Sequence, residues 1–246
     1  MNFKIILPVL LLLMVCLAMP TRAENEDCAD VKVLMYHHIR DAKEAQEKNQ
    51  TGLNVTPDYF EQHMKYLREE GYAVIGMDQL ISFLDDGIKL PDKSAMITVD
   101  DGYEDNYLDM FPILKKYGFR AIIFTPTGLV EKPDYLTWKQ IEEMNNSGLI
   151  TFANHTWSHH GSQGTKEKQL EEIGTANKEL EEKELNVQKT FAYPYGRASD
   201  NAKEVLRELG YKLAFTTTRG TMMCRESRFD LPRIRAGNAS LASYGL

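Results

Sequence analysis

Short apolar segments alternate with amphipathic helical segments along most of this 246-residue chain. Strands that alternate with helices form parallel sheets, because a connection between parallel strands needs about the length of a helix. The alternation therefore predicts one α/β domain with a parallel sheet, either open or closed into a barrel. Strands are expected over 31–38, 73–75, 94–99, 120–124, 149–153, 191–193, 213–215 and 228–234, helices over 57–70, 78–84, 108–117, 138–145, 166–184 and 199–209, and an irregular loop over 39–55. The expected helix N-caps are Thr56, Asp78, Thr137 and Ser199.

Two adjacent carboxylates follow the expected strand at 94–99. Asp100 and Asp101 come directly after it and precede Gly102. Ligands and catalytic groups of α/β proteins collect at the carboxyl ends of parallel strands, and a bound cation relieves the repulsion between neighbouring carboxylates. Successive side chains of an extended chain point in opposite directions, so we expect the two carboxylates to have different roles. Asp-Gly is also a common turn pair, so this segment alone is equally consistent with a surface turn.

Three of the six histidines lie close together after the expected strand at 149–153. His155 and His159 are four residues apart, and His160 follows. Two imidazoles at this spacing can face one metal ion, and neutral imidazole suits zinc and similar divalent ions. A histidine pair by itself is more often a surface feature. Together with a carboxylate of the Asp-Asp pair, however, the two form a three-ligand set that leaves positions open for water and substrate.

Three segments in this order resemble motifs of the polysaccharide deacetylases, the NodB-homology domain of carbohydrate esterase family 4. Residues 98–102 (TVDDG) are similar to the motif Thr-Phe-Asp-Asp-Gly, residues 155–159 (HTWSH) to His-Thr-x-x-His, and residues 191–196 (FAYPYG) to Arg-x-Pro-Tyr. The resemblance extends from about residue 31 to residue 234. It implies the distorted (β/α)7 barrel of this family in a single domain, whereas alternation alone does not distinguish a barrel from a doubly wound sheet.

The resemblance implies a metal-dependent hydrolase that removes N-acetyl groups from N-acetylglucosamine units of an extracellular or cell-wall polysaccharide. Asp101, His155 and His159 are the implied ligands of a divalent metal, with Zn²⁺ as the expected ion. Asp100 is the implied general base. The backbone N–H of Tyr195, in a turn shaped by a neighbouring proline and glycine, is the implied donor to the tetrahedral oxyanion.

The proton donor departs from the family pattern. Most members use a histidine in a late Leu-x-His motif, and this chain has no histidine after His160. The branch that acts on poly-N-acetylglucosamine carries Tyr-His near the first strand, as this chain does. This likeness implies His37 as the general acid, with His38 as the alternative. A glucosamine-containing exopolysaccharide is therefore the first substrate to consider, followed by peptidoglycan and chitin oligomers.

A second departure is Ala192, which stands where the family has an arginine that orients the base. Arg233 or Arg235, at the end of the last strand, could replace it. The departures leave two other classes open: a non-catalytic glycan-binding envelope protein with a decayed site, and a hydrolase of a non-sugar amide. Aromatic residues that could stack on sugars, each individually more often a core residue, are Tyr103, Tyr107, Trp138, Trp157 and Tyr195.

Residues 1–23 have the pattern of a secretory signal peptide, with Lys4 before an uncharged apolar run and Ala23 at the end. The run is too short for a confident membrane span. The pattern predicts that residues 24–246 form the deacetylase domain of a secreted or cell-envelope protein.

Two of the three cysteines, Cys28 and Cys224, lie near the two ends of this domain. In an exported protein they could form a disulfide, although sequence does not show whether they are close. The formal net charge is −7, and no basic stripe is present. This charge excludes a typical nucleic-acid-binding protein.

Overall fold

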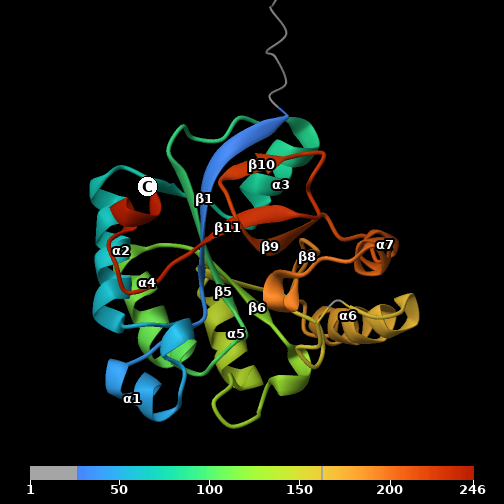
Figure 1. Ribbon diagram of the computed structural model, residues 1–246, viewed down its shortest axis with the longest axis horizontal. Helices are drawn as coiled ribbons and strands as arrows, with labels where there is room; N and C mark the ends of the chain where they lie inside the picture. Colours follow the sequence, from blue (N-terminus) through green and yellow to red (C-terminus); the bar gives the residue numbers. More distant parts are fainter. Residues whose placement is uncertain (1–26, 162) are drawn as a thin grey trace, which may run out of the picture.

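Seven parallel strands form a closed barrel (Figure 1). The computed structural model describes residues 27–161 and 163–246, so the signal peptide predicted over 1–23 lies outside the described residues. In order around the ring the strands are β1 (Cys28–Tyr36), β5 (Ser94–Asp100), β6 (Ala121–Thr125), β7 (Ile150–Asn154), β8 (Thr190–Ala192), β9 (Leu213–Arg219) and β11 (Leu231–Arg235). Strand β1 is hydrogen-bonded to both β5 and β11, which closes the ring. The closure confirms the predicted (β/α)7 barrel and excludes an open doubly wound sheet.

Four short strands lie outside the ring. Strand β4 (Ala73–Val74) runs parallel to β5, and β10 (Met222–Cys224) runs antiparallel to β1. Strands β2 (His38–Ile39) and β3 (Asn54–Val55) form a small separate sheet. The sequence does not predict β3 and β10, because strands of two or three residues are too short to show an alternating pattern.

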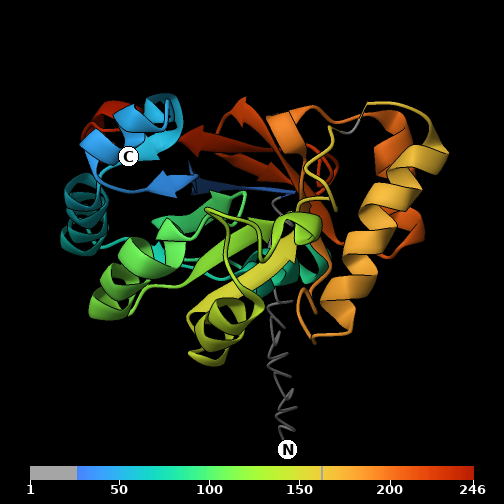
Figure 2. The same cartoon turned by 90° about the horizontal axis from the view of Figure 1, so that it is seen from below.

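Helices surround the barrel on its outer side (Figures 1 and 2). The α-helices are α1 (Ala42–Glu47), α2 (Pro57–Glu69), α3 (Met77–Asp86), α4 (Phe111–Tyr117), α5 (Trp138–Asn146), α6 (Lys166–Glu181) and α7 (Asp200–Glu208). Shorter helical turns are η1 (Thr51–Leu53), η2 (Asn106–Met110), η3 (Thr127–Leu129), η4 (Pro194–Gly196) and η5 (Leu241–Tyr244). Within the described residues, none of the helices combines the length and the apolar character needed to cross a bilayer.

Alternate side chains of the barrel strands pack into different apolar clusters, as the pleat of a strand requires. Val33 belongs to a cluster in which the rings of Phe124 and Phe215 lie edge to face, with their centroids 5.9 Å apart. Leu34, its neighbour in β1, belongs to a second cluster that includes Phe60 of α2. Because the strands are buried on both faces, their sequences are nearly continuous apolar runs. This makes them recognisable in the sequence.

The helix starts follow the predicted capping chemistry at three of four positions. The side chains of Thr56, Thr137 and Ser199 each accept a hydrogen bond from a backbone N–H in the first turn of α2, α5 and α7. The prediction for Asp78 was wrong, because α3 begins one residue earlier and its N-cap is Gly76. A carboxylate in the first turn interacts favourably with the helix dipole without capping the helix.

Two segments have a secondary structure that differs from the predicted one. The loop expected over 39–55 contains α1, η1, β2 and β3. The helix expected from residue 108 begins as the π-helical turn η2 and becomes α-helical only at Phe111. Both differences arise from contacts with distant parts of the chain, which local patterns do not contain. Asp105, directly before η2, hydrogen-bonds with the backbone N–H of Ile39 in β2.

Helix α6 buries most, but not all, of its apolar residues. The sequence pattern predicts an apolar stripe of Leu170, Ile173, Leu180 and Leu185, but Leu170 is 45% exposed. Ile173 and Leu180 are buried as expected, but Glu172 is buried with them at 3% exposure. A buried glutamate in a highly charged helix needs polar partners, and these are described below.

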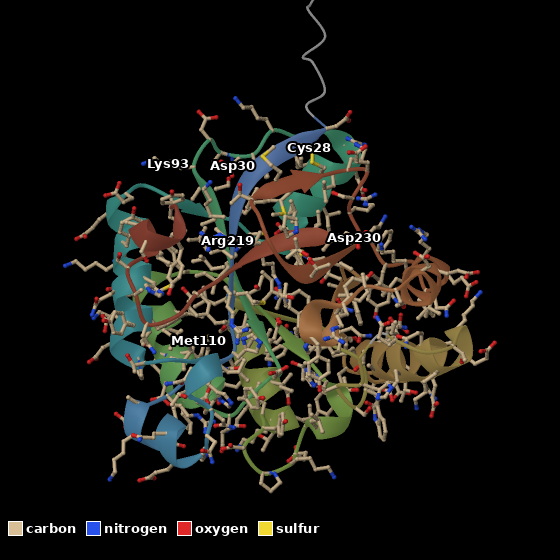
Figure 3. The ribbon with its side chains drawn as sticks, in the orientation of Figure 1. Cys28, Asp30, Lys93, Met110, Arg219 and Asp230 are labelled. Atoms are coloured by element: carbon tan, nitrogen blue, oxygen red, sulfur yellow. A yellow bond between two sulfur atoms is a disulfide. The ribbon has the colours of Figure 1, made fainter. Side chains whose placement is uncertain are left out.

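Cys28 and Cys224 form a disulfide that joins β1 to β10 (Figure 3). The two residues are 196 positions apart and directly opposite each other in the strand pair. The bond therefore connects the beginning of the described chain to its last quarter. Loop closure over so long a segment constrains the unfolded chain strongly.

Replacing both Cys28 and Cys224 with serine is expected to lower the free energy of unfolding by about 2–5 kcal/mol, because the unfolded chain regains the entropy of an open loop. Thermal unfolding measures this as a drop of about 2–4 °C in Tm per kcal/mol for a chain of this length. Wild-type protein treated with reductant is the matched control and should approach the variant. Equal Tm values for the variant and the oxidised wild type would contradict the expectation.

The C-terminal segment is attached to α2 and β1 through a buried histidine. His63 is 1% exposed, and its Nε2–H donates to the carbonyl of Ala239 at 2.7 Å. Its Nδ1 therefore carries a lone pair, which accepts from the hydroxyl of Tyr36 at 2.9 Å. Burial lowers the pKa of His63, because a charged imidazole has lost its hydration and the Ala239 carbonyl compensates only in part.

We expect this histidine to make the fold less stable in acid. The unfolded chain takes up a proton on His63 near the ordinary pKa, whereas the folded chain resists it, so stability is complete above about pH 6.5 and falls as the pH drops below that value. His63→Gln keeps a donor and an acceptor but does not titrate. Urea unfolding at a series of pH values should give a flatter curve for the variant, and identical slopes would count against this role.

Candidate metal and catalytic site

Residues that follow or end four barrel strands meet an arginine from within a fifth strand at one end of the barrel. Asp100 ends β5, His155 directly follows β7, and Tyr195 lies in η4 after β8. Arg233 lies in β11, and His37 directly follows β1. Parallel strands present all their carboxyl ends to the same side, so residues separated by up to 196 positions become neighbours. The sequence prediction that these segments share one site depends on this property of the barrel.

Asp101, His155 and His159 form a compact cluster whose ligand atoms all lie within 4.8 Å of one another. The Oδ1 atom of Asp101 is 3.3 Å from His155 Nε2 and 3.1 Å from His159 Nε2. Asp101 and His155 are buried, and His159 is partly exposed. This set could hold a divalent metal while leaving one side accessible.

The hydrogen bonding of the cluster fits a cation. His155 Nδ1 lies 2.7 Å from the carbonyl oxygen of Ala192, which can only accept, so the proton of a neutral ring sits on Nδ1. His155 Nε2 then directs a lone pair at the carboxylate of Asp101. Among the described residues, Asp101 Oδ1 has no well-formed hydrogen bond although it is buried. A metal ion between these atoms would relieve the repulsion, and the carbonyl would fix the ring as a metal ligand.

The charges of the cluster stabilise one another in the absence of a metal. Burial disfavours the charge of Asp101, but the two imidazoles outweigh it and hold the pKa of Asp101 well below its usual value. Burial likewise disfavours a charged His155, yet the carboxylates of Asp101 and Asp100 raise the pKa of His155 above its ordinary value. The site is therefore built to keep its carboxylates ionised.

Asp100 has a different partner, Arg233. The two guanidinium nitrogens of Arg233 each donate to one carboxylate oxygen of Asp100, both at 2.7 Å. Arg233 Nε also donates to the carbonyl of Thr216, and both members of the ion pair are buried. Burial opposes the charge of Asp100, but the guanidinium outweighs it and lowers the pKa of Asp100. Of the two candidates for the missing motif arginine, Arg233 lies against Asp100, whereas Arg235 donates to the carbonyl of Gly52.

The two aspartates thus have different partners, as expected. Strand alternation explains this difference only in part. Asp101 has a φ of 75°, so it lies outside the extended chain of β5. The turn at Asp101, and not strand alternation alone, directs its carboxylate toward the histidines. Asp100 is the last residue of β5, and its carboxylate meets Arg233 of β11.

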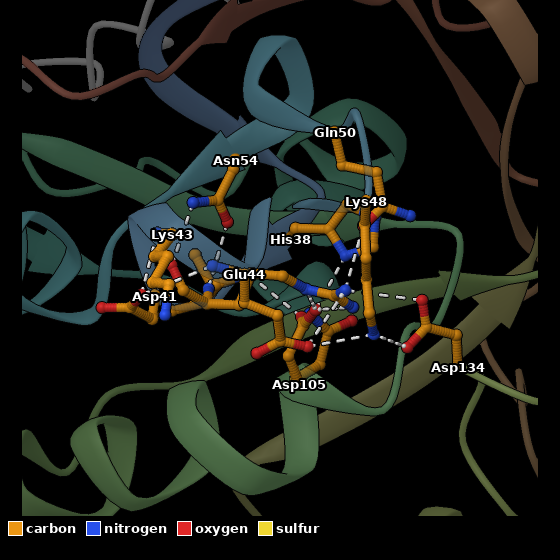
Figure 4. Close-up of polar contacts among 12 residues, drawn as sticks. His38, Asp41, Lys43, Glu44, Lys48, Gln50, Asn54, Asp105 and Asp134 are labelled. Atoms are coloured by element: carbon orange, nitrogen blue, oxygen red, sulfur yellow. Dashed lines mark hydrogen bonds and ion pairs between the residues drawn. The ribbon is translucent and has the colours of Figure 1, made fainter. Parts of the chain in front are cut away.

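The two histidines after β1 have different surroundings. Burial lowers the pKa of His37, and the nearby carboxylates of Asp100 and Asp101 oppose this without reversing it. His38 is completely buried, and its Nδ1 is hydrogen-bonded to Asp105 at 2.7 Å (Figure 4). Its ring stacks on Tyr103 with the centroids 3.6 Å apart. His37 is therefore under the influence of the Asp100 and Asp101 charges, whereas the His38 ring is engaged by Asp105 and Tyr103.

The ion-pair network around His38 has no recognisable signature in the sequence. Arg40 pairs with Asp105, and Arg40 and Lys48 both contact Asp134 (Figure 4). The network connects β2 and α1 to the chain after β5 and to the loop that precedes α5. Its residues are scattered over nearly one hundred positions, so no local motif could have revealed it.

Tyr195 lies beside the ligand cluster in a tight turn. Its φ is 60°, and its ring contacts His159 edge to face with the centroids 4.8 Å apart. At Gly196, φ is 69°, and a Cβ atom would lie 2.5 Å from the backbone nitrogen of Thr217. Only glycine fits there, so the turn carrying the Tyr195 backbone N–H stays close to the site.

Two of the five candidate sugar-stacking residues are exposed beside the cluster. Trp157 is 43% exposed and Tyr195 66% exposed. The other three pack against protein groups: Tyr103 on His38, Tyr107 on Phe111, and Trp138 under the ammonium group of Lys183.

Comparison with known proteins identifies the family. The sequence profile described as polysaccharide deacetylase matches residues 87–214, which is more than half of the chain and contains both the Asp-Asp and the His-x-x-x-His segments. The chain belongs to the polysaccharide deacetylase family. YxkH of Bacillus subtilis (strain 168), whose name refers to the same family, is 32% identical over 213 residues, covering 86% of this chain and 73% of YxkH.

Two other relatives extend the comparison. The poly-beta-1,6-N-acetyl-D-glucosamine N-deacetylase of Escherichia coli (strain K12) is 28% identical over 86% of this chain, which spans only 37% of that relative's length. The solved structure of the Streptococcus pyogenes deacetylase PplD in complex with acetate superimposes with a TM-score of 0.77 at 31% identity. The superposition covers 84% of this chain and 92% of that chain, so the likeness extends over almost the whole barrel.

We expect Arg233→Ala to lower the free energy of unfolding by about 3–5 kcal/mol, because it leaves the buried Asp100 carboxylate without a partner. The matched control is Arg235→Ala, an exposed arginine on the same strand, which should change stability by no more than about 0.5 kcal/mol. Urea unfolding at neutral pH measures both values. Similar losses for the two variants would show that the ion pair does not contribute specifically.

Proposed function

We propose that this protein is a metal-dependent N-deacetylase acting on N-acetylglucosamine units of an extracellular or cell-wall polysaccharide. One observation carries the proposal. His155 Nε2 and His159 Nε2 both lie against the carboxylate of Asp101, while a second ionised carboxylate, Asp100, is held nearby by Arg233. Family membership supports a hydrolase, and this pairing supports a metal-assisted hydrolysis in which one carboxylate binds the metal and the other moves a proton.

Asp101, His155 and His159 would hold the metal, with Zn²⁺ as the expected ion because two imidazoles and a carboxylate suit it. When bound, the metal polarises the acetamide carbonyl and makes a water molecule acidic. Asp100 would take a proton from the attacking water as general base. Arg233 holds both carboxylate oxygens of Asp100, which keeps the base ionised and fixes its direction.

Tyr195 and His37 would complete the reaction. The backbone N–H of Tyr195, held close by the glycine turn, donates to the oxyanion that forms when water adds to the carbonyl. Burial lowers the pKa of His37, so the free site holds it mainly as the neutral base at neutral pH. His37 then takes up the proton released through Asp100 and delivers it to the leaving nitrogen as general acid. Acetate departs, and the amine stays on the sugar.

The substrate is supported by the relatives and by the missing late histidine. The E. coli relative is named for poly-beta-1,6-N-acetyl-D-glucosamine, and this chain has a histidine after the first strand where other family members rely on a later one. The Cys28–Cys224 disulfide supports an oxidising compartment outside the cytoplasm. Trp157 and Tyr195, exposed beside the cluster, supply apolar faces on which sugar rings can stack.

The test is acetate release from β-1,6-linked N-acetylglucosamine oligomers by protein lacking residues 1–23, with β-1,4-linked oligomers in parallel. We expect release that chelator abolishes and Zn²⁺ restores. Asp100→Asn and His37→Ala should each lower kcat by at least about 100-fold, because each removes a proton-transfer group. His160→Ala is the matched control, since His160 lies next to His159 but outside the ligand cluster.

Different outcomes separate the alternatives. No acetate release from folded, metal-loaded protein on either oligomer would overturn a deacetylase of these sugars and favour another amide. Retained glycan affinity without any acetate release or metal binding would favour the glycan-binding protein. If His160→Ala loses as much activity as His37→Ala, the assignment of His37 as the general acid would be overturned.

A further inference from the structure

The carboxylate of Glu172 in α6 is buried against the loop that carries the histidine ligands. It accepts hydrogen bonds from the backbone N–H of Ser158 at 2.9 Å and from the Ser158 hydroxyl at 2.9 and 3.0 Å. Glu172 is only 3% exposed, and Lys168 of the same helix lies 3.3 Å from it. Burying a carboxylate is costly unless it is fully partnered, so these contacts hold Glu172 and Ser158 in one arrangement.

Ser158 lies between the two histidine ligands and directly precedes His159. The loop needs an external support, because Thr156 and His159 both have left-handed backbone conformations, with φ of 67° and 59°. Residues with a side chain adopt this conformation at a cost and keep it only where surrounding contacts impose it. Glu172 supplies such contacts from outside the loop.

The same helix supports the start of the loop. The Asn154 side chain donates to the carbonyl of Ile173 at 3.1 Å, and its oxygen accepts from the backbone N–H of Thr156 at 2.8 Å. Asn154 also donates to the hydroxyl of Tyr211. Two consecutive residues of α6, Glu172 and Ile173, therefore each receive hydrogen bonds from the loop or its base. The helix lies on the outside of the barrel beside α7 (Figures 1 and 2).

We propose that Glu172 is a positioning residue for the metal centre, acting through Ser158 to set the distance between His155 and His159. The inference rests on the proposed function, since it assumes that these histidines bind a metal. His155 is fixed independently by its hydrogen bond to Ala192. The role of Glu172 is to hold the more exposed His159 at the correct distance from His155.

The ionised state of Glu172 is consistent with this role. Burial alone would raise the pKa of Glu172, but the hydrogen bonds from Ser158 outweigh it and lower that pKa. A carboxylate that stays charged accepts from both donors of Ser158 at once, whereas an amide has one oxygen acceptor. Glu172→Gln should therefore weaken the support, and Glu172→Ala should remove it.

The test is metal affinity, measured by competition for Zn²⁺ with a chromophoric chelator, in protein lacking residues 1–23. We expect Glu172→Ala to weaken Zn²⁺ binding by about 10–100-fold and Glu172→Gln by less, as for other groups that orient metal ligands. Co²⁺ substitution adds a spectroscopic readout, because a displaced His159 alters the visible absorption of the bound ion. Ser158→Ala, which keeps the backbone donor, should weaken binding to a smaller extent.

The matched control is Glu171→Gln. Glu171 is adjacent in α6 and also pairs with Lys168, at 3.0 Å, but its side chain is 68% exposed. This variant should bind Zn²⁺ with wild-type affinity. If Glu172→Ala fails to fold, the more conservative Glu172→Gln and Ser158→Ala carry the test. Wild-type affinity and an unchanged Co²⁺ spectrum in the folded Glu172 and Ser158 variants would overturn the proposal.

Hydrogen exchange separates this inference from the proposed function. Backbone amides of residues 155–160 should exchange faster in metal-free Glu172→Ala than in metal-free wild type, because the loop has lost its support. A wild-type protein that binds neither Zn²⁺ nor Co²⁺ would overturn the proposed function. In that case unchanged exchange in the variant would also overturn the support by Glu172, and faster exchange would sustain it.

Discussion

Closure of the barrel between β1 and β5 is the constraint on which the rest of the structure depends. Six consecutive residue pairs, from Val31 with Ser94 to Tyr36 with Val99, join these strands in parallel. The closure brings the end of β1, with His37, beside the end of β5, with Asp100 and Asp101. It also places β11 on the other side of β1, so that Arg233 can reach Asp100. An open sheet with the same strands would leave these groups apart.

The site combines two kinds of electrostatic pairing at this end of the barrel. The ion pair of Asp100 and Arg233 is internally complete, because each carboxylate oxygen has a guanidinium partner. The cluster of Asp101, His155 and His159 is less complete, since both imidazoles lie against the same carboxylate oxygen of Asp101, which has no well-formed hydrogen bond within the described residues. The complete pair holds the Asp100 carboxylate in place, whereas the incomplete cluster could hold a cation. Adjacent residues in the sequence therefore have different surroundings because their partners differ.

Supports for these groups come from the surrounding shell of helices and loops. The ion pairs of Arg40, Asp105 and Asp134 secure the segment after β1. Helix α6 secures the histidine loop through Glu172, and the disulfide secures the opposite end of β1. Each support joins parts of the chain that are distant in sequence. Precise placement of a few reactive groups thus depends on many contacts that have no chemical role of their own.

The sequence by itself determined the alternating strands and helices, the caps at Thr56, Thr137 and Ser199, and the segments that supply the candidate ligands. These features are local, and short-range patterns encode them. Only the tertiary structure decided between barrel and open sheet, between Arg233 and Arg235, and whether the two cysteines meet. It also decided that Glu172, one of many charged residues in α6, is buried against the histidine loop. Such outcomes depend on which distant groups meet after folding, and a linear pattern does not contain that information.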